Sequence, residues 1–298
     1  MQKYLVFAYV VGSLVACRAA DNTGKDLGVS TDMAAPPGSD LSASSTDMAR
    51  NYIAGTPHDI DTSGPTGPYS ANAPVAVTDL IAISDVRFFL SKGKTICSYE
   101  VYVQDPACVT PPCGIVLKTD GGMAVTTSPN CPGVSTTTTP LKDVKLGDKL
   151  SAKGLVNVYQ DHPTVDGGAG GTMTQHGLEN ISSVVISASN QTLPTGVAAN
   201  PADFFDSNSL GWAKYESTRV TFSNVTVASV GTFGSFHTNP NYLSWGGDYD
   251  NNYRFFLSGD AGVYPNVNQT FKSLTGFVSS FPLAAGKFFA VQPADFVP

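Results

Sequence analysis

The stretch KLSAKGLVNVY at residues 149–159 is repeated in outline by TFKSLTGFVSSF at residues 270–281. Both read as long β-strands, and in both a Gly is followed two residues later by Val, at Gly154 and Val156 and at Gly276 and Val278. A strand of a small closed barrel must bend sharply, and Gly removes the side chain that would crowd the bend. The repeat therefore predicts two similar barrels in tandem.

Further strand-like segments surround both stretches. Runs rich in β-branched and aromatic residues, separated by Gly and Pro clusters, lie at 75–90, 98–105, 114–120, 181–189, 217–230, 251–259 and 287–296. We predict an all-β protein with two five-stranded units, at residues 74–190 and 191–298, that meet near NQTLPTGVAANP at 190–201.

The order of these segments resembles a known family of barrels. A long first strand, a hairpin with VQDP at 103–106 and Gly114-Ile115, a turn at Leu146-Gly147-Asp148 and the bent strand at Gly154 resemble the OB-fold units found in tandem ahead of the catalytic domain of secreted bacterial nucleases. Arg219-Val220 through Asn224-Val225 begin the second copy. Because the chain ends at Pro298, directly after this copy, we expect no nuclease domain and carry over no nuclease activity. The alternative is another all-β arrangement, such as two sandwiches.

Composition restricts the partners. The formal net charge is -7, and the one loose group of lysines (Lys142, Lys145, Lys149 and Lys153) is interrupted by Asp143 and Asp148. Nonspecific binding of DNA or RNA needs clustered Lys and Arg that replace counterions. The acidic balance argues against such binding.

The amino terminus reads as an export signal. Lys3 precedes an apolar segment of about a dozen residues, which is too short for a permanent membrane span, and Leu14-Val15-Ala16-Cys17 resembles the lipobox of bacterial lipoproteins. The resemblance implies a signal peptide at 1–16 and acylation of Cys17, and Arg18 in place of Asp implies sorting to the outer membrane.

Residues 17–73 are poor in large aliphatic side chains, so we predict a disordered tether there.

Four further cysteines lie close together at Cys97, Cys108, Cys113 and Cys131. An even number in an exported chain predicts two disulfides. We favour Cys108 with Cys113, because CVTPPC can close a hairpin loop, and Cys97 with Cys131, although sequence alone does not fix the pairing. A zinc site is the alternative, but the spacing lacks paired C-x-x-C motifs.

No catalytic signature stands out. The sequence has neither G-x-S-x-G nor H-E-x-x-H, so we predict no enzymatic activity and no resident cofactor. The OB resemblance directs a ligand to the outer face of the second and third strands and to the adjoining loops. The candidate ligand-binding residues are the outward positions Tyr102, Gln104, Arg254 and Phe256 and two histidines of the 160–177 loop, His162 and His176, that flank its Gly-rich stretch VDGGAGGTM. Packing against neighbouring side chains is the alternative for the aromatic residues, and plain exposure without a ligand is the alternative for the histidines.

One segment has the oxygen ligands of a calcium loop. Asp248, Asp250 and Asn252 alternate as such a loop begins, but Tyr253 and Gly259 stand where its Gly and its bidentate Glu belong. A polar hairpin turn is the alternative to a calcium site.

These observations predict a lipid-anchored protein of the bacterial envelope, periplasmic or surface-exposed, that acts as a non-catalytic binding module. The alternatives are an accessory subunit for extracellular nucleic-acid turnover, a calcium-dependent binder of carbohydrate or envelope polymer, and a purely structural envelope protein.

Overall fold

The computed structural model describes residues 50–63, 66–90, 96–123, 139–159, 175–204, 214–231, 236–239, 244–245, 265–279 and 287–298. Residues 47–298 form one compact unit. Within the described ranges, no helix is both long and apolar enough to cross a membrane.

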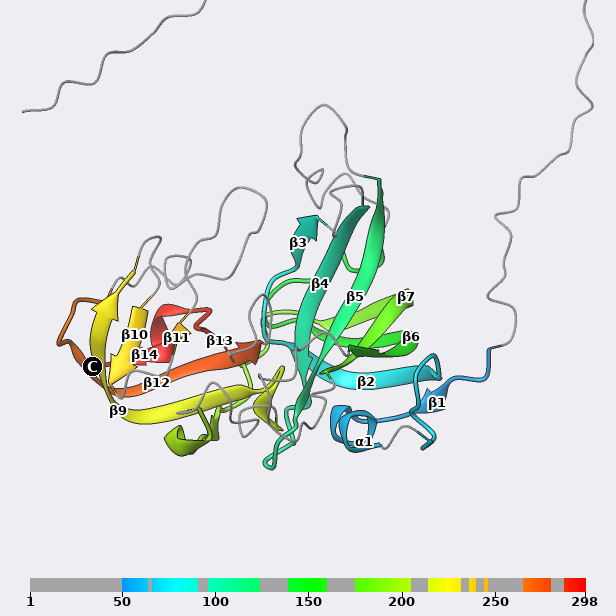
Figure 1. The fold of residues 1–298 in the computed structure, drawn as a ribbon. Helices are drawn as coiled ribbons and strands as arrows, with labels where there is room; N and C mark the ends of the chain where they lie inside the picture. The colour runs from blue at the N-terminus through cyan, green and yellow to red at the C-terminus, as the bar shows by residue number, and fades with distance from the viewer. Residues whose placement is uncertain are drawn as a thin grey trace, which may run out of the picture. The chain divides into compact units, whose positions relative to one another are not determined.

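The strands belong to two sheets (Figure 1). The first sheet contains β1 (Ile53–Ala54), β2 (Pro74–Ala82), β3 (Arg87–Leu90), β4 (Ile96–Gln104), β5 (Gly114–Met123), β6 (Lys149–Tyr159) and β7 (Gln175–Ala188). The second contains β8 (Val197–Ala198), β9 (Arg219–Val230), β10 (Phe236–Asn239), β11 (Ser244–Trp245), β12 (Thr270–Ser279), β13 (Lys287–Phe289) and β14 (Phe296–Val297). Short helices lie at α1 (Pro57–Thr62), η2 (Pro201–Phe204) and η5 (Pro293–Asp295), and Lys214 and Tyr215 are also in 3-10 conformation.

Five strands of the first sheet close into a barrel in the order β2-β6-β7-β5-β4, and β4 pairs back to β2. Only the β5–β7 pair within this ring is parallel. This is the connectivity of the OB fold, a five-stranded Greek-key barrel. The predicted OB-like barrel is confirmed.

The second sheet closes in the same way. Its ring is β9-β12-β13-β11-β10, and β10 pairs back to β9. The β11–β13 pair, which corresponds to β5–β7, is again the parallel one. Figure 1 shows β9 (yellow) and β12 (orange) running alongside each other as the long strands of this barrel.

A hydrogen-bonded turn leads into the bent strand of the first barrel. The Gly147 N–H donates to the carbonyl oxygen of Ala82 (2.9 Å), and the Ala82 N–H donates to that of Asp148 (2.8 Å). The Asp148 carboxylate accepts from the Lys145 N–H (2.8 Å). Gly147 has φ +80°, a conformation in which Gly lacks the penalty of other residues.

The second barrel repeats this turn almost atom for atom. The Asn268 N–H donates to the carbonyl oxygen of Val227 (2.8 Å), and the Val227 N–H donates to that of Gln269 (2.8 Å). The Gln269 side-chain oxygen accepts from the Asn266 N–H (3.0 Å), as the Asp148 carboxylate does in the first barrel. Asn268 takes the left-handed conformation with φ 69°. The repeat seen in the sequence is thus a structural repeat.

The first long strand of each barrel also contains one left-handed residue. Asp79 interrupts β2 with φ 59°, and Asn224 interrupts β9 with φ 56°. Asp and Asn tolerate this conformation better than other residues with a side chain. In β2 the register with β6 shifts between Val77 and Leu80, so Asp79 lies in a bulge that bends the strand.

Gly154 lies at a close approach between two strands. A Cβ at Gly154 would lie 2.8 Å from Cδ1 of Ile181 and 2.9 Å from the Glu179 carbonyl oxygen. The register of β6 with β7 shifts at this point, between Lys153 and Leu155. The glycine therefore allows β7 to approach closely where the ladder is irregular.

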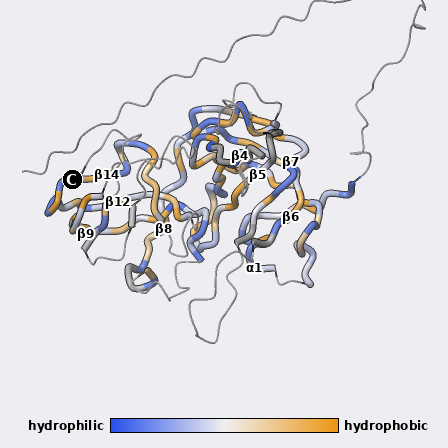
Figure 2. The backbone as a smooth tube through the Cα atoms, turned by 45° about the horizontal axis from the view of Figure 1, so that its top comes forward, coloured by the Kyte–Doolittle hydropathy of each residue, from blue (hydrophilic) through white to orange (hydrophobic). Residues whose placement is uncertain are grey.

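Each barrel has its own hydrophobic core, and Figure 2 shows hydrophobic segments recurring along the strands of both sheets. The first core is aliphatic, with buried Val, Leu and Ile side chains that include Val101, Val103, Leu150 and Ile181. The second core is rich in phenylalanine: Phe204, Phe222, Phe236, Phe271, Phe288 and Phe296.

The predicted tether boundary at residue 73 is wrong. Strand β1 pairs in parallel with β2, and Ile60 of helix α1 is fully buried in the first core. Helix α1 begins with a capping box, in which the Thr56 hydroxyl accepts from the Asp59 N–H (3.1 Å) and the Asp59 carboxylate accepts from the Thr56 N–H (3.2 Å). One buried aliphatic residue and a capped turn attach this segment to the barrel, despite its polar composition.

Candidate binding faces of the two barrels

The outer face of β4 alternates as predicted. Val101 and Val103 belong to the first core, whereas Tyr102 and Gln104 point away from it. Neither Tyr102 nor Gln104 is exposed, since their exposed fractions are 1% and 0%, so packing against neighbours, and not the exposed binding position, is the outcome for Tyr102. Residues of the second sheet cover both.

Tyr102 lies at the centre of an apolar contact between residues of the two sheets. Its ring centroid is 4.7 Å from that of Phe277 on β12, and Phe277 lies 5.4 Å from Phe289 on β13. This third buried cluster consists of Ile83, Tyr102, Val116, Phe277 and Phe289. In an OB fold, the β4–β5 face is where a ligand is expected, so part of that face is already occupied by the chain itself.

The hydroxyl of Tyr102 is held by polar partners within this contact. Arg87 donates to it from Nη2 (2.5 Å), and it lies 2.8 Å from the Ser279 hydroxyl. Arg87 also forms an ion pair with Glu100, and both are almost fully buried. Burial raises the pKa of Tyr102, and the nearby Arg87 charge opposes this rise without cancelling it. The phenol therefore stays protonated and serves as a structural hydrogen-bonding group.

Gln104 makes a second polar link. Its Oε1 accepts from the Arg219 N–H (2.8 Å) at the start of β9. The Arg219 guanidinium donates to the Pro194 carbonyl oxygen (3.1 Å) and to the Asp295 carboxylate (2.6 Å). These contacts connect β4, the 190–196 segment and η5 through one arginine.

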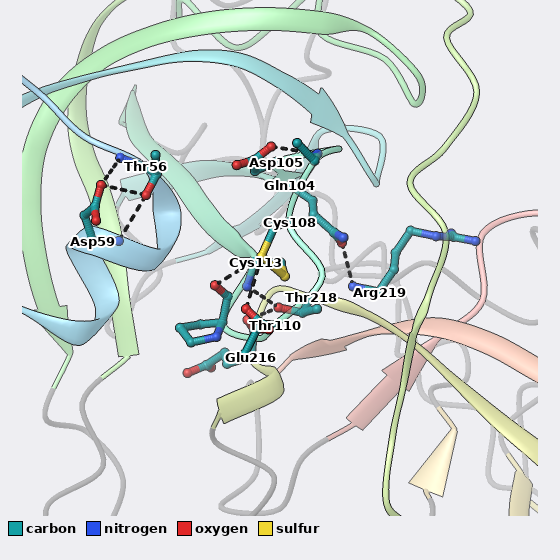
Figure 3. The surroundings of a disulfide bond; sticks show 12 residues. Thr56, Asp59, Gln104, Asp105, Cys108, Thr110, Cys113, Glu216, Thr218 and Arg219 are labelled. Atoms are coloured by element: carbon teal, nitrogen blue, oxygen red, sulfur yellow. Dashed lines mark hydrogen bonds between the residues drawn. A yellow bond between two sulfur atoms is a disulfide. The ribbon is translucent and has the colours of Figure 1, made fainter.

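The hairpin loop between β4 and β5 is closed by the predicted disulfide between Cys108 and Cys113 (Figure 3). The Cys113 N–H donates to the Thr218 hydroxyl (2.9 Å), as Figure 3 shows. A Cβ at the neighbouring Gly114 would lie 1.7 Å from the Ser217 carbonyl oxygen. The disulfide-closed end of this hairpin therefore packs directly against the backbone that precedes β9.

The equivalent face of the second barrel belongs to β10 and β11. Phe236 and Thr238 are fully buried, and His237 between them is exposed. In the ladder His237 pairs with the exposed Ser229 on β9 and with Ser244 on β11. In the described parts of β9, β10 and β11 the one basic side chain besides His237 is Arg219, which is buried against Asp295. His237 has no recognisable partner or motif in the sequence, and its position next to Phe236 in a strand-like alternation of apolar and polar residues is the one signal that could have pointed to it.

Most of the other predicted site residues lie outside the described residues. These are Cys17, Cys131, His162, Asp248, Asp250, Asn252, Arg254 and Phe256. Cys97 lies on β4 opposite Leu90. Its pairing with Cys131 stays a prediction, because Cys131 lies outside the described residues. His176 was expected in a loop but lies on β7 opposite Val158. The described ranges contain no group of His, Cys, Asp or Glu that could hold a metal ion.

Comparison with known proteins gives matches among solved structures alone. The sequence matches no protein-family profile and no curated protein. Among solved structures, it resembles the SSB domain of a Synechococcus sp. protein, with 14% identity over 38% of this chain and 92% of that chain and a TM-score of 0.24. A small single-stranded DNA-binding protein from Streptomyces coelicolor is similar at 10% identity over 41% of this chain and 97% of that chain, also with a TM-score of 0.24. The OB assignment rests on the strand pairing of the two barrels.

Proposed function

We propose that this chain is a non-catalytic binding module of the bacterial envelope, anchored by acylated Cys17, in which the second barrel presents the ligand-binding face. One observation carries the choice of barrel. The outer face of β4 and β5 is covered at Tyr102, Gln104 and Val116, whereas the matching face of β10 and β11 exposes His237, which lies opposite the exposed Ser229 of β9.

The side chains on this second face favour an uncharged ligand. Besides His237, its described strands offer no basic group toward solvent, and the chain as a whole carries a net charge of -7. A phosphate backbone is bound through Lys and Arg, whereas imidazole and hydroxyl groups donate and accept single hydrogen bonds. A hydroxyl-rich polymer, such as an envelope glycan, fits these groups better than a nucleic acid does.

The experiment is a binding screen with residues 47–298, the compact unit that contains all three buried clusters. The fragment is probed on arrays of envelope glycans and single-stranded DNA, with and without calcium. We expect glycan binding that His237→Ala weakens at least about tenfold, as expected for a hydrogen bond lost at a binding face. His58→Ala is the matched control, because His58 is exposed on α1 of the first barrel.

Three results would count against this proposal. Glycan binding that His237→Ala leaves unchanged would move the site away from this face. Salt-sensitive DNA binding would favour the accessory role in nucleic-acid turnover. Binding that requires calcium and is lost in Asp248→Ala/Asp250→Ala would favour the calcium-dependent binder.

The anchor is tested separately. In cells that express the full chain, we expect incorporation of a labelled fatty acid and recovery in the outer-membrane fraction, both lost in Cys17→Ala. Several acyl chains on one residue anchor a protein stably, whereas a single chain does not. Unchanged fractionation of the variant would refute lipidation as the anchor.

A further inference from the structure

The carboxyl-terminal half of β7 is an exposed sheet edge. β5 pairs with β7 only at Gly177 and Leu178, and beyond Asn180, which takes φ 50°, the ladder partner of β7 in the described chain is β6. Val185 is 62% exposed and Ile186 is 37% exposed, which is unusual for adjacent aliphatic residues on a strand. An open edge of this kind is a template for pairing with another strand.

The backbone directions on this edge follow from the neighbouring ladder. The Val156 N–H and carbonyl point toward residues 72 and 73, on the β2 side of β6. Because directions alternate along a strand, Ser151 and Lys153 point the other way, toward Val185 and Ser183. The N–H and carbonyl groups of Val184 and Ile186 therefore point outward, and no backbone hydrogen bond within the described residues reaches them.

Charge argues for a second copy as the partner. Residues 180–191 (NISSVVISASNQ) contain no charged side chain, although the whole chain has a net charge of -7. Native sheets commonly protect an exposed edge with Lys or another charge. In pairing about a two-fold axis, each residue of the strand faces a residue of the same strand in the other copy, so here no charge would meet a like charge or be buried without a partner.

We propose that two copies of this chain pair along β7 in antiparallel orientation, with the two-fold axis at Val185. In this register Val184 of one copy and Ile186 of the other exchange backbone hydrogen bonds, because both point outward. The two Val185 side chains then form a non-hydrogen-bonded pair, the closest type of cross-strand pair. The exposed valine becomes buried against its own copy.

The expected dimer is weak. A single pair of edge strands buries less surface than a stable interface requires, so we expect reversible association of residues 47–298 at submillimolar concentration. Anchoring of many copies at one membrane would raise their local concentration. The pairing itself does not depend on the anchor or on the proposed ligand.

The first test is sedimentation equilibrium of residues 47–298. We expect Val185→Lys to raise the dimer dissociation constant by about tenfold or more, because a lysine on this edge would meet its own copy. Val109→Lys is the matched control with the same charge change, since Val109 is 83% exposed on the disulfide-closed loop. The control should dimerise like the unmodified protein.

The second test is cross-linking, which also checks the register. In Val185→Cys the two sulfurs would lie at the axis, where a non-hydrogen-bonded pair has the Cα separation that a disulfide needs. With diamide added as the thiol oxidant, we expect rapid intermolecular disulfide formation with this variant and not with Val267→Cys, a control at a position that is 47% exposed. A monomer at all concentrations, a dimer insensitive to Val185→Lys, or equal cross-linking of both cysteine variants would overturn the proposal.

Discussion

The two barrels share their hydrogen-bonded turns and differ in what their outer faces do. Gly147 and Asp148 in the first barrel make the same backbone bonds as Asn268 and Gln269 in the second. The β4 face of the first barrel, however, is covered around Tyr102, while the matching β10 face exposes His237. The turns and cores thus determine the fold of each barrel, whereas contacts between the two barrels determine which outer face is open to a ligand.

The largest expected effect comes from removing the packing that covers the outer face of β4 in the first barrel. Tyr102→Ala removes a fully buried aromatic ring from the cluster with Phe277, and we expect the free energy of unfolding to fall by about 3–5 kcal/mol. Tyr102→Phe keeps the ring and loses the bonds to Arg87 and Ser279, so we expect a loss of about 1–3 kcal/mol.

Urea unfolding followed by two probes measures this effect. Both tryptophans, Trp212 and Trp245, lie between residues 191 and 298, so we expect their fluorescence to follow unfolding of that half of the chain, whereas circular dichroism follows both halves. We expect the two probes to diverge in Tyr102→Ala. A loss below about 1 kcal/mol in this variant would contradict a covered, well-packed face.

An intermediate effect tests the likeness of the barrels. Asp79 and Asn224 hold the same left-handed conformation in the first strand of each barrel, so Asp79→Ala and Asn224→Ala should each cost about 1 kcal/mol. Replacement by Gly avoids this penalty and is the control at both sites. Urea titration of the four variants measures their free energies of unfolding. Markedly unequal losses for Asp79→Ala and Asn224→Ala would show that the two positions are not equivalent.

The smallest effect is acid sensitivity, with one carboxylate in each barrel. The hydrogen bond from the Thr56 hydroxyl lowers the pKa of Asp59 below its ordinary value of 3.8. Partial burial opposes ionisation of Asp203, but hydrogen bonds from Lys214 and Tyr215 outweigh it and lower the pKa of Asp203 as well.

The sign of the acid effect follows from these shifts. Both folded-state pKa values lie below the unfolded ones, so each carboxylate contributes stability above about pH 4, and this contribution is lost as pH falls through the lowered values. In urea unfolding between pH 5 and 2, Asp203→Asn should flatten the pH dependence seen by tryptophan fluorescence, and Asp59→Asn should leave that signal alone. The reverse pattern would contradict these assignments.

Much of the fold could be predicted from the sequence, because strand pattern and turn chemistry are local. Gly154 and Gly276 predict one long strand in each barrel, and the Gly147-Asp148 pair predicts the turn before the first of them. The burial of Tyr102 could not be predicted, since alternation along β4 shows which residues face outward and not what covers them. The attachment of residues 50–62 had a signal in Thr56-Pro57-His58-Asp59, a capping box with Pro at the first helical position, which the polar composition obscured.

The attachment of β1 has a mechanical consequence. If the chain is anchored upstream, drag on the protein is carried by the segment that enters at residue 50 before it reaches β2. A pulling force along β1 would act in shear on its short parallel pairing with β2. Once that pairing breaks, the burial of Ile60 in the first core would resist further extension. The protein would then yield under tension in two steps, first by release of β1 and then by withdrawal of α1, while the five-stranded ring stays closed.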